Sequence, residues 1–206
     1  MRKNLLALLL FLLTGNLVLS AQDCNKTDKQ GRRQGLWMDF YANGQKRYEG
    51  TFKNDRCTGE FKYYDEQGNL KAANTFDRSG EKALNKTYDP NGTMIATGYY
   101  VNRKKDGEWR YFSRENGKLI LVEENKDGKV QGNSTAYFEN GVVMMERQFV
   151  NDQPEGHAKV YYPSGALKEE GDYHLGNKTG IWKTYSEEGD VISSDNYSAP
   201  VINDFN

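Results

Sequence analysis

The sequence predicts an all-β fold, an elongated antiparallel meander of about seven β-hairpin repeats that follows a signal peptide. Three observations predict it. A tight turn that ends in glycine returns about every 24 residues, an aromatic residue precedes each turn, and apolar and polar residues alternate after it. A fixed period of this length is typical of proteins in which each repeat is one supersecondary element. The turn glycines are Gly44, Gly68, Gly92, Gly117, Gly141, Gly165 and Gly189.

The turns have the composition of a short hairpin loop. Residues 89–92 read Asp-Pro-Asn-Gly, and residues 162–165 read Tyr-Pro-Ser-Gly. Proline fixes φ at about −65°, as the second position of a type I turn requires, and the glycine then closes the loop in a left-handed conformation. Only glycine adopts that conformation without a steric penalty. Each turn glycine therefore predicts one hairpin.

Each turn lies between two predicted strands. After the turn at Gly165, Leu167 and Tyr173 fall on one face of the strand, whereas Glu170 and Asp172 fall on the other. Each repeat thus supplies two short strands, and strands joined by hairpins pair with their neighbours in sequence. The aromatic residues that precede the turns are Phe40, Tyr64, Tyr88, Phe112, Tyr137, Tyr161 and Tyr185.

Two repeats depart from the pattern. The third begins with Ala83 and Asn85, where most repeats have a glycine and several have an aromatic residue two positions later. The fourth has one extra residue between Phe112 and Gly117. We expect irregular pairing or a β-bulge there. Function is best sought where the repeat lapses, around Ala83–Asn85 and at Asn125, or along the edges of the sheet.

The N-terminus has the pattern of a secretory signal peptide. Arg2 and Lys3 precede a wholly apolar run, residues 5–13, which is shorter than the ~20 residues that span a bilayer. An uncleaved anchor is the alternative, although Asn16 interrupts the stretch early. We predict export to the periplasm or the medium, without stable membrane insertion after cleavage. The predicted parts are a signal peptide at 1–21, an N-terminal linker at 22–34, the repeat domain at 35–197 and a tail at 198–206.

The two cysteines suggest one disulfide bond. In an exported chain Cys24 and Cys57 would join the N-terminus to the first repeat. Two unpaired thiols are the equal alternative, because the sequence does not give their separation. Acylation of Cys24 is disfavoured, since Asp23 stands where a lipoprotein signal has a small residue.

Charge and motifs exclude several function classes. Without residues 1–21 the chain has 26 Lys and Arg against 29 Asp and Glu, a net charge of −3, which disfavours nucleic acid as a partner. His157 and His174 are the only histidines, and no Cys or His cluster has metal-ligand spacing. No phosphate-binding loop or nucleophile motif occurs. The sequence therefore predicts a protein without catalytic residues, cofactor or metal.

A second aromatic series consists of Trp37, Phe61, Trp109 and Trp182. One interpretation is a ladder of side chains that supports the sheet. The other is an exposed platform on which a glycan or peptide stacks, because aromatic rings offer broad, rigid contact area. The series is interrupted in the remaining repeats, by Asn85, Ser134 and Ala158. These interruptions favour the ladder.

The pattern Gly-x-Trp-x-x-Tyr-x-x-x-Gly at residues 180–189, together with Gly-x-Tyr at residues 98–100, resembles the variant MORN repeat. More specifically, residues 31–197 are similar to the bacterial MORN-repeat proteins grouped as YwqK-family antitoxins. The resemblance implies β-hairpin repeats and a role in binding or scaffolding. The antitoxin label implies a toxin as partner.

Together these observations predict an exported, non-enzymatic scaffold that binds a protein partner of unknown identity through the face of its sheet. One alternative is an antitoxin or immunity-type protein that neutralises a toxin. Another is a glycan- or envelope-binding module. The sheet edges at both ends also offer unpaired backbone groups to a partner strand.

Overall fold

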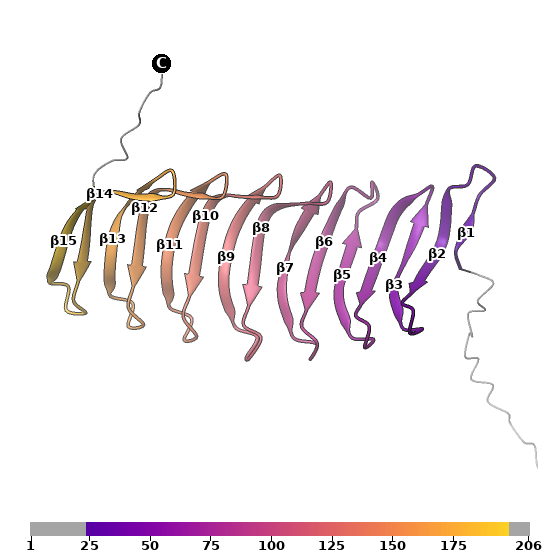
Figure 1. Cartoon of the computed structure of the whole chain (residues 1–206), viewed down its shortest axis with the longest axis horizontal. Coiled ribbons are helices and arrows are strands. Elements are labelled where there is room, and N and C mark those ends of the chain that lie inside the picture. The colour runs from indigo at the N-terminus through magenta and orange to yellow at the C-terminus, as the bar shows by residue number, and fades with distance from the viewer. Residues whose placement is uncertain (1–23, 198–206) are drawn as a thin grey trace, which may run out of the picture.

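The computed structural model describes residues 24–197, so the predicted signal peptide and tail lie outside the described residues. All strands belong to one antiparallel sheet, in which each strand pairs with its neighbours in sequence (Figure 1). The predicted all-β meander is confirmed. The strands are β1 (Lys26–Thr27), β2 (Arg33–Phe40), β3 (Lys46–Lys53), β4 (Arg56–Tyr64), β5 (Leu70–Phe76), β6 (Lys82–Tyr88), β7 (Met94–Val101), β8 (Lys104–Phe112), β9 (Leu119–Lys126), β10 (Lys129–Tyr137), β11 (Val143–Val150), β12 (Gln153–Tyr161), β13 (Leu167–His174), β14 (Asn177–Tyr185) and β15 (Val191–Tyr197).

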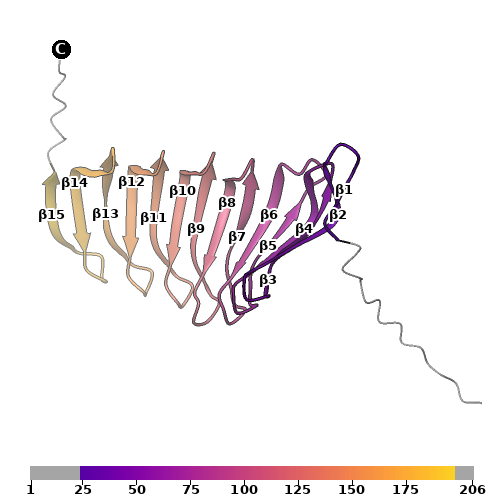
Figure 2. The ribbon, with the colours of Figure 1, turned by 45° about the vertical axis from the view of Figure 1, so that its right-hand side comes forward.

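The sheet is a single row of strands, as a second view shows (Figure 2). The segment 22–34, which was expected to be a linker, contains the first strand of the sheet: β1 pairs with the start of β2. The turn between them is closed by the carboxylate of Asp28, which accepts hydrogen bonds from the backbone N–H groups of Gln30 and Arg32. The hydrogen bond from the Arg32 side chain lowers the pKa of Asp28 to about 2. In residues 24–197 no helix is long and apolar enough to cross a membrane.

Two kinds of turn alternate along the meander. The seven predicted turn glycines all have positive φ, and their turns form the lower edge of the sheet in Figure 1. Most turns at the upper edge are two residues long with both residues at positive φ, which is the geometry of a type I′ hairpin. These upper turns are Asn54-Asp55, Asn102-Arg103, Asp127-Gly128, Asn151-Asp152 and Leu175-Gly176.

The expectation of irregular pairing at Ala83–Asn85 is wrong, because β5 and β6 pair there without a register shift; the shift that β6 does have lies between Thr87 and Tyr88, beside the lower turn as in the other repeats. After each two-residue turn the pairing shifts register near a glycine of positive φ. Ala83 does not have positive φ, and β5 pairs with β6 without a shift, from Ala72↔Thr87 to Phe76↔Ala83. The connection between β5 and β6, residues 77–81, is longer than the two-residue turns, and it takes up the residues that form the bulge in other repeats. The bulge glycines are Gly59, Gly107, Gly132, Gly156 and Gly180.

The extra residue of the fourth repeat lies in a turn. Phe112 pairs with Leu119 beside a register shift of the kind seen at the other lower turns, so the extra residue does not alter the pairing of β8 with β9. The connection between β8 and β9 is longer by that residue, and the N–H of Gly117 donates to the carbonyl of Ser113 at 2.9 Å.

The apolar core lies on one face of the sheet, which we call the inner face. Trp109 and Trp182 are each 2% exposed, and their rings lie on glycines of the preceding strand. A Cβ atom on Gly98 would be 2.4 Å from the Trp109 ring, and Gly171 has the same relation to Trp182. Each indole N–H donates to a backbone carbonyl at 3.0 Å, that of Tyr99 for Trp109. Glycine thus lets an indole lie against the backbone of the neighbouring strand.

Candidate functional site

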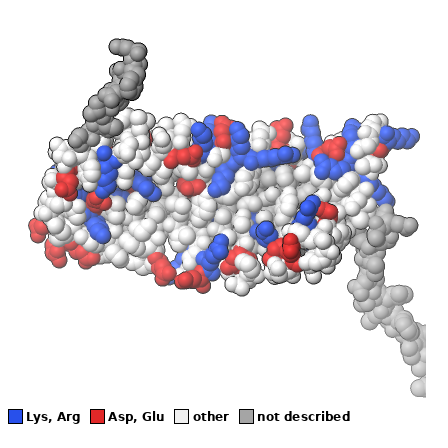
Figure 3. Space-filling model, viewed as in Figure 1, with Lys and Arg blue, Asp and Glu red and all other residues white. Residues whose placement is uncertain are grey.

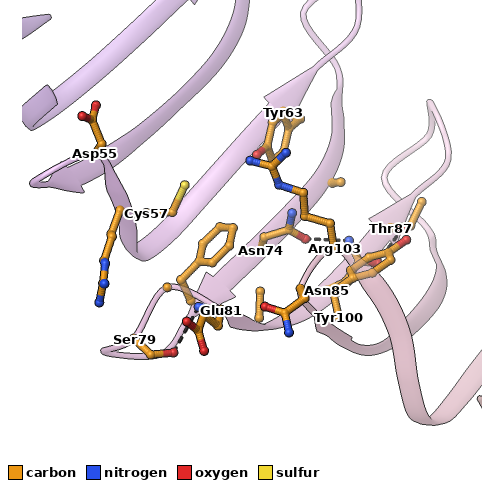
Figure 4. Close-up of a pocket in the computed structure, with 16 residues that line it drawn as sticks. Asp55, Cys57, Tyr63, Asn74, Ser79, Glu81, Asn85, Thr87, Tyr100 and Arg103 are labelled. Carbon is orange, nitrogen blue, oxygen red and sulfur yellow. Dashed lines mark hydrogen bonds between the residues drawn. The ribbon is translucent and has the colours of Figure 1, made fainter. Parts of the chain in front are cut away.

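A pocket of about 890 Å³ opens on the inner face where the third repeat departs from the pattern (Figure 4). Strands β4 to β7 form its floor and walls, and the turns at the upper edge form its rim. The lapse at Ala83–Asn85 therefore coincides with a hollow in the sheet. The second lapse differs, because Asn125 does not line this pocket; it is buried and donates its side-chain amide to Glu123 Oε1 at 3.4 Å.

The floor is an amide pair in place of a glycine and an indole. Asn74 pairs with Asn85 in the same way as Gly98 pairs with Trp109. Asn85, which is 4% exposed, donates from Nδ2 to Asn74 Oδ1 at 2.7 Å and accepts at Oδ1 from the Thr87 hydroxyl at 2.8 Å. Because an amide is much smaller than an indole, the substitution leaves space that no neighbouring side chain fills.

Aromatic rings form the walls. Phe76 meets the core ring of Phe61 edge-on at 5.3 Å, and Tyr100 meets Trp109 edge-on at 5.0 Å, so both walls are held by buried neighbours. Tyr63 lines a third side. Burial raises the pKa of its phenol, which keeps it protonated near neutral pH. The walls thus present ring surfaces and one hydroxyl.

The long loop between β5 and β6 forms part of the rim. Asp77 accepts hydrogen bonds from the Ser79 hydroxyl at 2.7 Å and the Gly80 N–H at 2.9 Å, which hold the loop in shape. Gly80 lies so close to β4 that a Cβ atom there would be 2.8 Å from the carbonyl oxygen of Cys57. The loop therefore leans on the neighbouring hairpin and deepens the pocket.

The rim is rich in cations. Arg56 and Arg103 line the pocket, and Lys and Arg side chains gather along the middle of the upper edge in Figure 3. Among the described residues neither arginine forms an ion pair, whereas Asp55 is bound by Arg33 at 2.9 Å. Arg103 extends toward Tyr63 (Figure 4). Glu81 supplies the one other acidic side chain of the lining.

The four aromatic residues proposed as a stacking platform are placed differently. Phe61, Trp109 and Trp182 are each 2% exposed, so their faces are not available to a ligand. Lys105 lies 4.7 Å from the centre of the Trp109 ring, and Lys178 lies 3.8 Å from that of Trp182. Trp37 is half-buried. The burial of Phe61, Trp109 and Trp182 corrects the platform interpretation for these three residues and agrees with a supporting ladder.

Cys24 and Cys57 are not joined by a disulfide bond. Cys24 precedes β1, whereas Cys57 lies in β4, and β2 and β3 stand between these strands. Three strand spacings amount to roughly 14 Å, beyond the ~7 Å between Cα atoms that a disulfide allows. Burial raises the pKa of the Cys57 thiol, which disfavours the reactive thiolate.

Neither histidine lines the pocket of the third repeat. His157 Nδ1 is 3.0 Å from Asp172, and His174 Nδ1 is 2.9 Å from Glu155. All four side chains are at least one-third exposed. Within residues 24–197 no cluster of His, Cys, Asp or Glu has the arrangement of a metal site.

Tyrosine–glutamate pairs recur along the sheet and were not foreseen from the sequence. Tyr64 donates to Glu49 at 2.6 Å, and Tyr161 donates to Glu146 at 2.7 Å. Burial and the carboxylate raise the pKa of both phenols to about 12. The same causes raise the pKa of Tyr111, whose partner is Glu123. A signal exists in the sequence, because Glu49 and Glu146 each lie five residues after a turn glycine.

These pairs predict a loss of stability in alkali. A phenol whose pKa is raised on folding contributes stability below its unfolded pKa, near 10, and loses it as the pH rises through the folded value. The urea midpoint is therefore expected to fall between pH 10 and 12. In Tyr64→Phe, which removes one such phenol, the fall should be smaller. An equal fall in the variant would contradict this assignment.

Six segments of the chain match the family model of the MORN repeat variant: residues 33–54, 58–78, 83–102, 126–151, 154–174 and 178–199. Among solved structures, the crystal structure of TarM is similar at 13% sequence identity over 59% of this chain and 19% of that chain, with a TM-score of 0.25. A TM-score of this size supports no inference about function. No curated protein matches the chain in sequence.

Proposed function

Because the chain belongs to the family of the MORN repeat variant, we propose that it is an exported scaffold that binds a protein partner along its open sheet and catalyses no reaction. The signal-peptide pattern supports the exported location. The residues that recur in every repeat form the turns and the core, which leaves the outer surfaces of the sheet for binding. A toxin-neutralising role is a narrower form of the same proposal.

The observation that carries the proposal is the C-terminal edge of the sheet. Within the described residues β15 pairs only with β14. Val191 is 58% exposed and Ile192 is 64% exposed, and Ile181 on β14 is 58% exposed. An edge strand with apolar side chains offers backbone hydrogen bonds and contact area to an extended segment of another protein.

The N-terminal edge offers less. The outermost strand at this edge, β1, has only two residues, and Arg33 on the neighbouring strand forms an ion pair with Asp55. Short strands and charged side chains are the usual means by which an edge is protected from pairing. The two ends therefore differ in their capacity to bind, and β15 is the end we assign to a partner.

A photo-crosslinking amino acid at Ile192 tests this assignment in the full chain, with its native signal, in cells of the source. A discrete adduct is expected from position 192 and not from the exposed control position Glu108 on β8. The double change Val191→Lys and Ile192→Lys should weaken partner binding by ~10-fold, because it places two charges in the contact. Cell fractionation of the same samples reports the location.

Two results would contradict the proposal. One is equal adduct formation from both positions, which indicates nonspecific capture. The other is turnover of a substrate by the purified protein, with no adduct at position 192. If the crosslinked partner is a toxin and the chain inhibits its activity, the narrower antitoxin role follows.

A further inference from the structure

The pocket of the third repeat interrupts the aromatic ladder between two buried rings. Phe61 on β4 ends the ladder on one side, and Trp109 on β8 ends it on the other. Four strand spacings separate them, a length of roughly 19 Å. The hollow is therefore a cup closed at both ends along the sheet. Within it, the walls Phe76 on β5 and Tyr100 on β7 lie two strand spacings apart, roughly 9 Å, so the cup suits a single compact ring better than an extended peptide, which would have to pass over the indole.

The floor and walls combine two kinds of contact. Asn74, Asn85 and Thr87 supply amide and hydroxyl groups, and the hydrogen bond between the two amides uses only part of their capacity. Phe76 and Tyr100 supply ring surfaces. Sugar rings need this combination, because their hydroxyls exchange hydrogen bonds with amides while their C–H faces lie on aromatic rings.

The rim adds a charge preference. Arg56 and Arg103 have no carboxylate partner among residues 24–197, and the Asp55 carboxylate beside them is already bound by Arg33. A guanidinium group matches a carboxylate with two parallel N–H···O hydrogen bonds. Only Glu81 opposes this preference in the lining. An acidic ligand is therefore favoured over a neutral one.

We propose that this pocket binds an acidic sugar, a pyranose ring that carries a carboxylate. The ring lies between Phe76 and Tyr100, its hydroxyls contact Asn74 and Thr87, and Arg103 holds the carboxylate. The site lies on the inner face, whereas the partner assigned above binds at β15. The two proposals are therefore independent, and the failure of one does not contradict the other.

Calorimetric titration of the full chain with glucuronic acid tests the site, with glucose as the neutral control. Saturable binding is expected for glucuronic acid, at least ~10-fold tighter than for glucose, because a charge-assisted bidentate contact is lost with the neutral sugar. Arg103→Gln should weaken binding by a similar factor. Arg114→Gln, which changes an exposed arginine in a turn at the opposite edge, should leave it unchanged.

A filled pocket gives the sharper control. The double change Asn74→Gly and Asn85→Trp recreates the pair that Gly98 and Trp109 form on β7 and β8, so the sheet has a known way to accommodate it. This variant is expected to fold, as circular dichroism would show, and to lose binding. The double change at Val191 and Ile192 should leave sugar binding intact.

Four outcomes would overturn the proposal. They are an absence of saturable binding by the unaltered chain, equal affinity for glucose, unchanged binding in the filled variant, and unchanged binding in Arg103→Gln. If a hexamer of glutamate binds more tightly than glucuronic acid, and if this binding is lost in the filled variant, the pocket is a peptide site instead.

Discussion

Replacement of Trp109 by alanine is expected to lower the free energy of unfolding by ~3–5 kcal/mol, the cost of removing a large buried aromatic side chain. The indole is 2% exposed, contacts Tyr100 edge-on and donates its N–H to the carbonyl of Tyr99. Its loss leaves a cavity on the inner face and removes the hydrogen bond to the Tyr99 carbonyl. Urea unfolding followed by circular dichroism measures the change.

Trp37→Ala is the matched control for this loss. Trp37 belongs to the same aromatic series but is half-buried, near the N-terminal edge of the sheet. Its indole N–H donates to the backbone carbonyl of Lys26 at 3.2 Å. The destabilisation should be clearly smaller than at Trp109. Equal losses would show that burial by the neighbouring strands does not set the stability of the ladder.

Gly98→Ala is expected to destabilise the fold by about 1–3 kcal/mol, because the added methyl group overlaps the Trp109 ring. Relief of this overlap requires the indole or the strand to move. The same change in the Trp109→Ala background should cost much less, since the ring is gone. A double-mutant cycle measures the coupling, and additive effects of the two changes would contradict the close packing of ring on glycine.

The hairpins were predictable because their signal is local. A turn such as residues 89–92 contains within itself the proline and glycine that determine its shape. The two-residue turns at the upper edge were less evident, because Asn102-Arg103 and Asn151-Asp152 reach positive φ without the usual Asn-Gly sequence. There the turn geometry follows from the pairing of the flanking residues, Val101 with Lys104 and Val150 with Gln153.

The burial of the aromatic ladder was left open by the sequence, since it depends on contacts between strands. Gly50, Gly98 and Gly171 each lie 11 residues before the ring that covers them. That spacing is a readable signal once a hairpin is assumed. It would have separated Phe61, Trp109 and Trp182 from any exposed platform.

The sequence marked the position at which the pocket lies, but it did not predict a cavity. The lapse at Ala83 and Asn85 indicated a departure, and irregular pairing was the natural expectation. Instead β5 pairs with β6 without a register shift, and Ala83 lacks the positive φ of the bulge glycines. The hollow arises because Asn85 stands where Trp109 stands in the next repeat, and an amide fills much less space than an indole. Asn74, on the neighbouring strand, stands where that repeat has Gly98 and adds an amide to the floor, which the lapse at Ala83–Asn85 alone does not reveal.

The pairing of every strand with its neighbours in sequence also bears on how the chain folds. All-β proteins usually fold slowly because distant segments must meet before they gain contacts. Here each hairpin closes locally and then serves as a template for the next, as in other repeat arrays. The chain can begin to fold at any well-formed hairpin and extend in both directions. Whole hairpins can therefore be gained or lost in evolution without rebuilding the rest of the sheet.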